Sequence, residues 1–282
     1  MKLTILIHCA DGVGIISAVT NFLHVKGGNI IYLDQHVDLE TGVFFMRLES
    51  EFQTDISLKN LKKGFQNDLA SPYQMKWSMH MAGIRLKMAL FVSKYNHCLY
   101  DLLSRYNSGE LNVEIPFIIS NHKDLEYIAD QFAIPFHCIA VTKTTKDKAE
   151  KEQLKLLKEK AVDFIVLARY MQIISPDLIS VYPNKIINIH HSFLPAFAGA
   201  RPYHAAYERG VKIIGATSHY VTEELDAGPI IDQDVTTVSH SHSIQDFITK
   251  GRDLEKIVLS RAVKLHLERK TMVYNNKTVI FT

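Results

Sequence analysis

The chain contains two short segments whose side chains together could carry out chemistry on an acyl group. The first holds Asn188 and His190, and the second holds Asp226. Attack on an amide carbonyl places negative charge on oxygen, which an Asn side chain can stabilise by donating a hydrogen bond. An imidazole can deliver the proton that the departing nitrogen needs, and a carboxylate can orient water and the imidazole. We therefore expect Asn188, His190 and Asp226 to be catalytic.

Residues 185–190 must hold the first of these segments in place. They form an apolar, β-branched run after a turn at 182–184, which predicts a buried strand. Side chains alternate along a strand, so Asn188 and His190 share one face while Ile189 packs on the other. The carboxyl ends of strands are where open α/β sheets bind ligands. An isolated Asn-x-His would more simply bond to loop backbone groups, but the sequence around this pair favours a site.

Three motifs resemble those of folate-dependent formyltransferases and of their hydrolytic relative, the formyltetrahydrofolate deformylases. They are Asn-Ile-His-x-Ser-x-Leu-Pro from residue 188, Leu-Asp-x-Gly-Pro-Ile from residue 225, and the run 167–176, which is similar to the family's folate-binding loop. The resemblance covers roughly the C-terminal two-thirds of the chain, the extent of one α/β domain. It implies that the acyl group is the formyl group on N10 of a folate and that 10-formyltetrahydrofolate is the substrate.

The same resemblance implies a folate site at residues 171–174. Met171, Ile173 and Ile174 would form apolar walls for a flat pterin, and Gln172 could recognise its amide-like edge. These residues could equally be core residues at the end of the preceding strand, and the resemblance favours the site. We expect folate to act as substrate, with no tightly bound cofactor.

Residues 93–98 bear on the choice between hydrolysis and transfer. Transferases that act on glycinamide ribonucleotide resemble this chain but have a glycine-rich loop here, whose backbone N–H groups hold the substrate phosphate. This segment has no glycine, and Tyr95, Asn96 and His97 place bulk where a phosphate would need close approach. Its pattern, Ser-Lys-x-x-His-Cys-Leu-x-Asp-Leu-Leu, also resembles the deformylase signature. We expect hydrolysis of 10-formyltetrahydrofolate to formate and tetrahydrofolate, supplying formate for purine synthesis. A formyltransferase with another amine acceptor and a non-catalytic folate or amino-acid sensor are the alternatives.

His240 and His242 follow Val-Ser at a point where deformylases commonly show Val-Ser-His and then Arg-Asp. Their spacing predicts that they lie on one face of an extended segment, as two metal ligands could. With 14 histidines in the chain such spacing arises by chance, and no His-Glu-x-x-His motif accompanies it. We therefore expect no metal site.

The first 82 residues predict a separate βαββαβ domain with a ferredoxin-like fold. Its expected elements are strands at 3–8, 29–38, 43–49 and 74–80, with helices at 13–26 and near 56–69. Asp11-Gly12-Val13-Gly14-Ile15 and the glycines at 27 and 28 resemble an ACT regulatory domain.

The ACT resemblance implies a small amino-acid effector, glycine or methionine, held by Asp11, Gly12, Gly14 and Asn29. Glycines at the start of a helix let a carboxylate approach its free N–H groups, although they could equally serve only a tight turn. The resemblance also implies pairing between subunits, so we expect a homodimer or homotetramer.

From residue 83 to residue 282 strands alternate with helices, which predicts a Rossmann-like, largely parallel sheet. The expected parallel strands are 86–92, 113–119, 136–140, 164–168 and 186–190. Antiparallel edge strands at 211–221 and 230–238, a closing helix at 251–269 and a small hairpin at 273–279 complete the domain.

Composition limits the other classes of function. The chain has 32 basic and 30 acidic residues without a basic stripe, so we expect no nucleic-acid partner. No apolar run is long enough for a signal peptide or a membrane span, which favours a cytoplasmic protein without membrane contact. Cys9, Cys98 and Cys138 lack a Cys-x-x-Cys spacing and are expected to be free, buried thiols.

Overall fold

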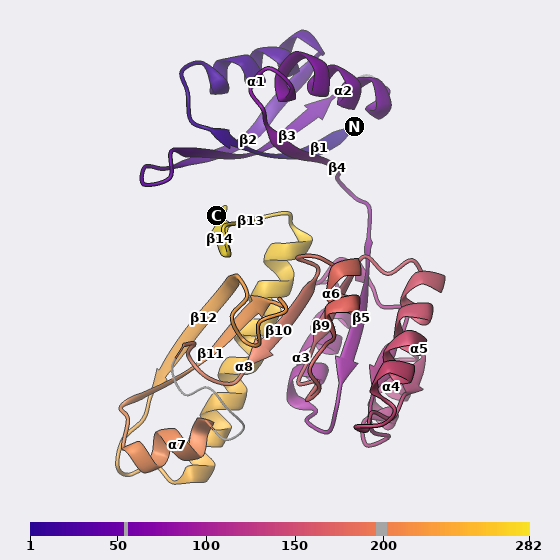
Figure 1. The fold of residues 1–282 in the computed structure, drawn as a ribbon, viewed down its shortest axis with the longest axis vertical. Helices are drawn as coiled ribbons and strands as arrows, with labels where there is room; N and C mark the ends of the chain where they lie inside the picture. Colours follow the sequence, from indigo (N-terminus) through magenta and orange to yellow (C-terminus); the bar gives the residue numbers. More distant parts are fainter. Residues whose placement is uncertain (54–55, 196–201) are drawn as a thin grey trace. The chain divides into compact units, whose positions relative to one another are not determined.

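The computed structural model describes residues 1–53, 56–195 and 202–282 (Figure 1). The chain forms two compact units, one of Met1–Ile84 with Ile280–Thr282 and one of Arg85–Val279. The sequence predicts a boundary after residue 82 and assigns the C-terminus to the second domain. In the structure the last three residues belong to the first unit instead. There the Tyr32 hydroxyl donates a hydrogen bond to the carbonyl of Thr282 at 2.5 Å.

The first unit is a four-stranded antiparallel sheet with two helices on one face (Figure 1). The strand order is β2-β3-β1-β4, and the predicted βαββαβ sequence of elements is confirmed. The second helix begins after Ser57, whose side chain caps it, and it continues as a short π-helix. The elements are β1 Lys2–Ala10, α1 Ile15–Val25, β2 Gly28–Asp38, β3 Val43–Phe52, α2 Leu58–Phe65, η1 Gln66–Ala70 and β4 Lys76–Met81.

The second unit contains a sheet of order β12-β11-β10-β9-β5-β7-β8, with β6 paired to β5. Strands β10, β9, β5, β7 and β8 run parallel, whereas β11 and β12 are antiparallel to their neighbours, as predicted. The strands are β5 Leu86–Val92, β6 Val113–Glu114, β7 Ile118–Ser120, β8 Phe136–Cys138, β9 Phe164–Leu167, β10 Ile186–His190, β11 Ile213–Tyr220 and β12 Ile230–Thr237.

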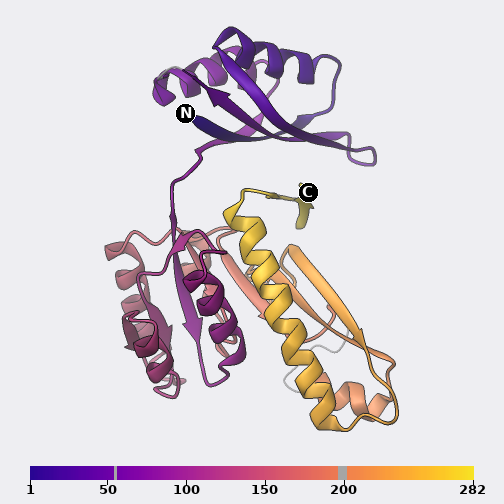
Figure 2. The same ribbon diagram turned by 180° about the vertical axis from the view of Figure 1, so that it is seen from behind.

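Helices cover both faces of this sheet. α8 and α3 lie side by side on one face (Figure 2), and α5 and α6 pack against the other through an apolar cluster. The helices are α3 His97–Asn107, α4 Glu126–Gln131, α5 Lys146–Glu159, α6 Pro176–Val181, α7 Pro202–Arg209 and α8 Ile244–Leu267.

Two predicted elements have different bounds for local reasons. The strand expected at 113–119 is split into β6 and β7 around Pro116, which has no N–H for a ladder. The closing helix begins seven residues before Gly251, because Ser243 and Asp246 form a capping box. Gly251 lies inside α8, where a Cβ atom would collide with the Tyr203 ring.

The structure confirms the predicted terminal hairpin and contradicts two other predictions. The terminal hairpin is confirmed as β13 Thr271–Tyr274 and β14 Lys277–Ile280, with Asn275 and Asn276 at positive φ in the turn. The prediction of three buried thiols is wrong for Cys138, which is exposed near the sheet edge. His240 lies in a turn, so the extended segment expected at 240–242 is also wrong.

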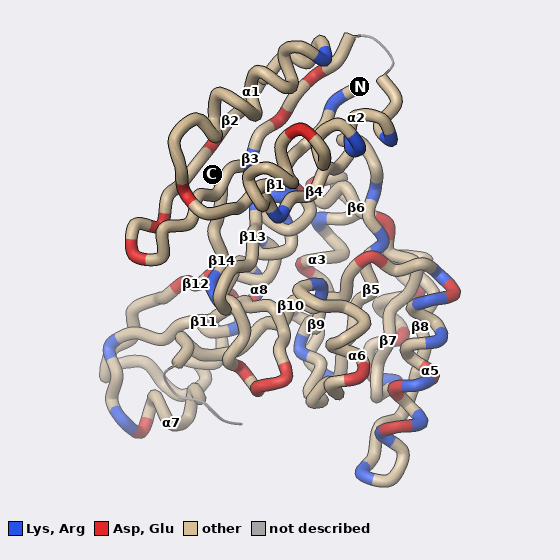
Figure 3. Tube along the Cα trace, turned by 45° about the horizontal axis from the view of Figure 1, so that its top comes forward, with Lys and Arg blue, Asp and Glu red and all other residues tan. Residues whose placement is uncertain are grey.

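Lys and Arg residues are interspersed with Asp and Glu along both units (Figure 3). Among the described residues no helix is both long enough and apolar enough to cross a membrane.

Candidate active site

The fold brings the three predicted catalytic residues together. Asn188 and His190 lie on β10, and Asp226 lies in the loop between β11 and β12. Nδ1 of His190 is 3.3 Å from Oδ1 of Asp226. His190 is only 6% exposed, and its Nε2 is buried without a hydrogen-bond partner among the described residues. Because Nδ1 faces the carboxylate, Nε2 is the nitrogen left to exchange a proton with a substrate.

Asp226 is held as a carboxylate. Hydrogen bonding from Nδ1 of His190 lowers the pKa of this carboxyl far below its usual value despite partial burial. Its backbone has φ of +55°, an uncommon conformation for a residue other than glycine. Two residues on, a Cβ at Gly228 would collide with the carbonyl oxygen of Tyr220, so only glycine lets this loop pack on β11.

His219 is a fourth member of the site that the sequence did not indicate. β10 and β11 pair antiparallel with Asn188 opposite His219. Nδ1 of His219 donates to the carbonyl of Tyr220 at 3.0 Å, so Nε2 is free to accept from Nδ2 of Asn188 at 3.2 Å. This contact fixes which way the Asn188 amide points and uses only one of its two N–H groups. The signal for His219 is the strand register, which residue types do not reveal.

A cavity of about 490 Å³ opens beside these residues, and we refer to it as the large cavity. All seven predicted catalytic and folate-binding residues line it, namely Met171, Gln172, Ile173, Ile174, Asn188, His190 and Asp226. Met171 is 47% and Ile173 60% exposed, so both present apolar surface to the opening, whereas Ile174 is buried in the apolar core cluster between the sheet and α6. Exposed apolar side chains around a polar centre suit a flat, partly apolar ligand.

The segment after β5 supports the loop that carries Met171. The backbone N–H of Met171 donates to Oγ of Ser93 at 3.0 Å, and Ser93 Oγ itself donates to Asn121 at 2.6 Å. Tyr95, from the glycine-free segment 93–98, packs its ring against the guanidinium of Arg169 at 5.1 Å. The bulky Tyr95 side chain of this segment therefore contacts the charged side chain of Arg169.

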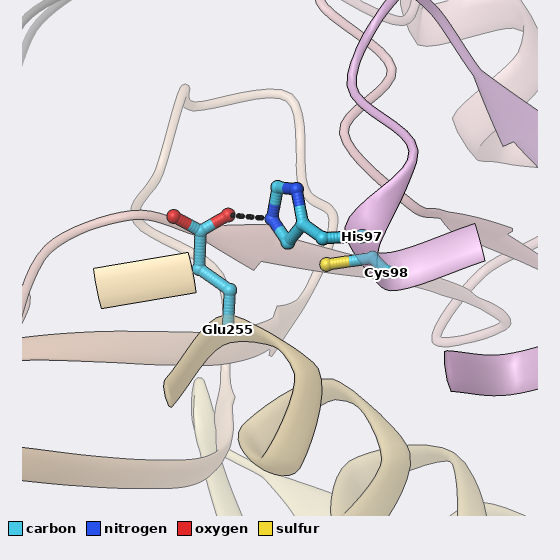
Figure 4. A group of neighbouring side chains, drawn as sticks. All are labelled: His97, Cys98 and Glu255. Atoms are coloured by element: carbon cyan, nitrogen blue, oxygen red, sulfur yellow. Dashed lines mark hydrogen bonds and ion pairs between the residues drawn. The ribbon is translucent and has the colours of Figure 1, made fainter. Parts of the chain in front are cut away.

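A second histidine–carboxylate pair lies close by (Figure 4). Nε2 of His97 is 2.8 Å from Oε2 of Glu255, and the Tyr203 hydroxyl donates to Oε1 at 2.6 Å. Burial favours the protonated acid, yet the His97 hydrogen bond and the Arg169 charge together lower the pKa of Glu255 to about 2. The described residues also bring Cys98 to this pair, with the three possible ligand atoms within 4.8 Å of one another.

The chemistry of this group fits an ion pair better than a metal site. Burial raises the pKa of the Cys98 thiol well above its usual value, so the thiolate that binds metal is disfavoured. The guanidinium of Arg169 already lies 3.4 Å from Glu255. A cation at that distance would repel a second cation bound to the same carboxylate.

The predicted effector residues are not gathered within one chain. Asp11, Gly12 and Gly14 lie in the turn between β1 and α1, whereas Asn29 lies near the start of β2. In the sheet Asn29 is opposite Glu51, at the far end from that turn. The two places are roughly 25 Å apart at the usual rise of a strand.

Comparison with known proteins gives a consistent result. A family model described as "Formyl transferase" matches residues 86–263. The chain is 51% identical over 279 residues to a formyltetrahydrofolate deformylase of Synechocystis sp., covering 99% of this chain and 98% of that protein. It is 47% identical over 278 residues to the Bacillus subtilis protein of the same name, covering 98% and 93%. A crystal structure of a formyltetrahydrofolate deformylase from Pseudomonas syringae pv. tomato matches with a TM-score of 0.97 at 45% identity, covering 100% of this chain and 95% of that chain.

Proposed function

The chain belongs to the formyltetrahydrofolate deformylase family, and we propose that Asn188, His190 and Asp226 are the groups with which it hydrolyses 10-formyltetrahydrofolate. One observation carries this assignment. His190 faces Asp226 with one ring nitrogen and leaves the other, buried and unbonded to any described residue, beside the large cavity. A histidine arranged in this way can both accept and return a proton.

In the proposed reaction, Nε2 of His190 takes a proton from a water molecule as the water oxygen bonds to the formyl carbon. The second N–H of Asn188 donates to the oxyanion that develops, and Asp226 stabilises the imidazolium through Nδ1. The bond between the formyl carbon and N10 then breaks, and His190 returns the proton to N10. The resulting formic acid releases its remaining acidic proton, so the products are formate and tetrahydrofolate.

The pterin of the folate is proposed to lie in the large cavity. Met171 and Ile173 would pack on its faces, with Ile174 lining the same cavity, and the side chain of Gln172 would pair with its amide-like edge. In the proposed position N10 would lie toward His190, with the rest of the molecule directed to solvent. No tightly bound cofactor is needed for these steps.

A single assay tests hydrolysis against the two other functions. Purified protein is given 10-formyltetrahydrofolate without any amine, and formate and tetrahydrofolate are quantified. Hydrolysis predicts the two products in equal amounts. Formate-free turnover that appears only after an amine is added would instead support a transferase, and folate binding without turnover under either condition would support a sensor.

We further propose that the first unit is an ACT regulatory domain. Its strand order and its two helices on one face support this assignment. Gly14, at φ of +89°, precedes α1, and no side chain caps the first turn of that helix. The free N–H groups there suit the carboxylate of glycine or methionine.

Two copies of the chain would complete such an effector site. β2 is an edge strand, so it can pair with β2 of a second copy. Antiparallel pairing would bring Asn29 of one copy beside Asp38 of the other. Asp38 and Ala10 both pair with Val43, which places this end of the sheet next to Asp11.

The oligomer and the effector can be measured together. Light scattering after size-exclusion chromatography is expected to give a homodimer or homotetramer. Titration of glycine and of methionine to millimolar concentration is expected to change the hydrolysis rate with one of them. Activity that ignores both would restrict the first unit to assembly. We place the enzyme in the cytoplasm, where its formate would feed purine synthesis.

A further inference from the structure

A second hollow of about 230 Å³, which we call the small cavity, adjoins the large cavity. Arg169 and His191 line both cavities and therefore form the wall between them. Tyr95, Arg252 and Glu255 line other sides of the small cavity. None of the catalytic steps proposed above uses this space.

Arg169 brings a positive charge into the wall with few partners of its own. The residue is only 8% exposed, and its Nε is buried without a hydrogen-bond partner in the described part of the chain. Glu255 lies 3.4 Å from that nitrogen, but the two do not form a hydrogen bond. Leaving a charged donor buried without a hydrogen bond is costly even beside an opposite charge. The unused Nε donor suits an anionic ligand.

Glu255 gives Arg169 an opposite charge but no hydrogen bond, because other donors already occupy its two oxygens. His97 bonds to Oε2 at 2.8 Å, and Tyr203 donates to Oε1 at 2.6 Å. A second guanidinium, that of Arg252, lies 5.7 Å from the centre of the Tyr95 ring. The small cavity thus has two guanidinium groups and one carboxylate among its lining residues, and this balance favours an anion.

We propose that the small cavity is a binding site for formate, held by Arg169 after it leaves the reacting carbon. This inference rests on the hydrolysis proposed above, which makes formate beside His190, next to the wall residue His191. A carboxylate matches the planar fork of a guanidinium and can accept two parallel hydrogen bonds from it. Movement of formate across the wall clears the large cavity of one product while tetrahydrofolate still occupies it.

Direct binding of formate tests this site without relying on turnover. Sodium formate is titrated into the full-length protein at constant ionic strength, and binding is followed by NMR of isotope-labelled formate. Arg169→Gln removes the charge and the fork, and should weaken formate binding about tenfold or more. Arg105→Gln is the matched control, because Arg105 pairs with Asp101 and Glu110 on the surface of α3. It should bind formate as the unmodified protein does.

Glu255→Gln gives a change of opposite sign. It removes the carboxylate that competes for Arg169 while keeping an oxygen that Tyr203 can bond, so formate should bind several-fold more tightly, by about threefold or more. A general loss of structure would weaken binding instead. Should Arg169→Gln fail to fold, Glu255→Gln decides alone: unchanged or weaker binding overturns the site when the circular dichroism spectrum of this variant matches that of the unmodified protein.

The outcomes for this site and for hydrolysis remain separate. Equal formate affinity in Arg169→Gln and in the unmodified protein overturns the formate site. So does the absence of saturable formate binding in a protein that releases formate from 10-formyltetrahydrofolate. Formate binding that depends on Arg169, in a protein without turnover, supports the site and contradicts hydrolysis.

Discussion

Two histidine–carboxylate pairs lie near each other in the second unit, and they differ in what each leaves free. His190 and Asp226 are 3.3 Å apart, and the other nitrogen of His190 bonds to none of the described residues. His97 and Glu255 are 2.8 Å apart, but Glu255 also accepts from Tyr203 and is only 1% exposed. The first pair borders the large cavity with an unused atom, whereas the carboxylate of the second has both oxygens occupied.

Residue types alone therefore do not identify a catalytic pair. An imidazole beside a carboxylate can transfer protons only when one of its atoms can reach a substrate. When the surrounding groups satisfy the carboxylate instead, the pair fixes neighbouring side chains in position. We therefore propose that His190 with Asp226 transfers protons, and that His97 with Glu255 holds Tyr203 in position.

His190→Asn should have the largest effect, because it removes the group proposed to transfer protons and leaves a side chain of similar polarity. We expect kcat to fall about a thousandfold, within the range for general acid–base groups. Binding of tetrahydrofolate, measured by fluorescence titration, should change little. His24→Asn, at an exposed position on α1, is the control and should keep full activity. Retention of most of the activity in His190→Asn would remove the distinction between the two pairs.

Glu255 should control stability in acid. Its pKa is lowered in the folded protein from 4.5 to about 2, so the carboxylate stabilises the fold above its unfolded pKa. This contribution, of about 3 kcal/mol, is lost as the pH falls from 4.5 through about 2. Urea unfolding at a series of pH values should therefore show a shallower acid dependence for Glu255→Gln than for the unmodified protein. Parallel curves would mean that His97 and Arg169 do not hold this carboxylate in its charged form.

Asn188→Ala tests the hydrogen bond that Asn188 is proposed to donate to the oxyanion, beside the His190–Asp226 pair. Loss of one such donor should lower kcat about a hundredfold, because the contact is strongest once charge has developed on oxygen. KM should change much less than kcat. Asn112→Ala, which removes only a surface contact with Arg85, serves as the control. A rise in KM with unchanged kcat would assign Asn188 to ground-state binding.

His219 should have the smallest effect, since it acts through Asn188. His219→Phe removes the acceptor for the Asn188 amide and should lower kcat up to about tenfold, as expected for one hydrogen bond. His219→Gln can still accept from Asn188 and should recover part of the rate. Equal kcat values in the two variants, or a loss in KM alone, would contradict a positioning role.

The sequence could predict that most residues of the candidate site lie together, because its parts are local in sequence. Asn188 and His190 share a strand face through simple alternation, and the run 171–174 follows the next strand at the same edge. The element order of both units follows from apolar periodicity and from turns at Gly and Asn. Those signals do not depend on knowing which segments meet in space.

The remainder depends on contacts between distant segments. His219 meets Asn188 only because β10 and β11 pair in one register. His97 and Glu255 lie on different helices, and their contact requires α8 to pack beside α3. The early start of α8 was readable from Ser243 and Asp246, but Gly251 suggested a later start, and its real role is the close approach of Tyr203. Local propensity cannot report such packing.

The most direct test compares Asp226→Asn with Glu255→Gln in water enriched in heavy oxygen, with 10-formyltetrahydrofolate as the only organic substrate. Formate release is timed, its isotope content is read by mass spectrometry, and Asp253→Asn, at an exposed position on α8, is the control. We predict that formate from the unmodified protein carries one oxygen from the water. Release should slow about a thousandfold in Asp226→Asn and less than about tenfold in Glu255→Gln. Unlabelled formate, or unmodified rates in Asp226→Asn, would contradict the account.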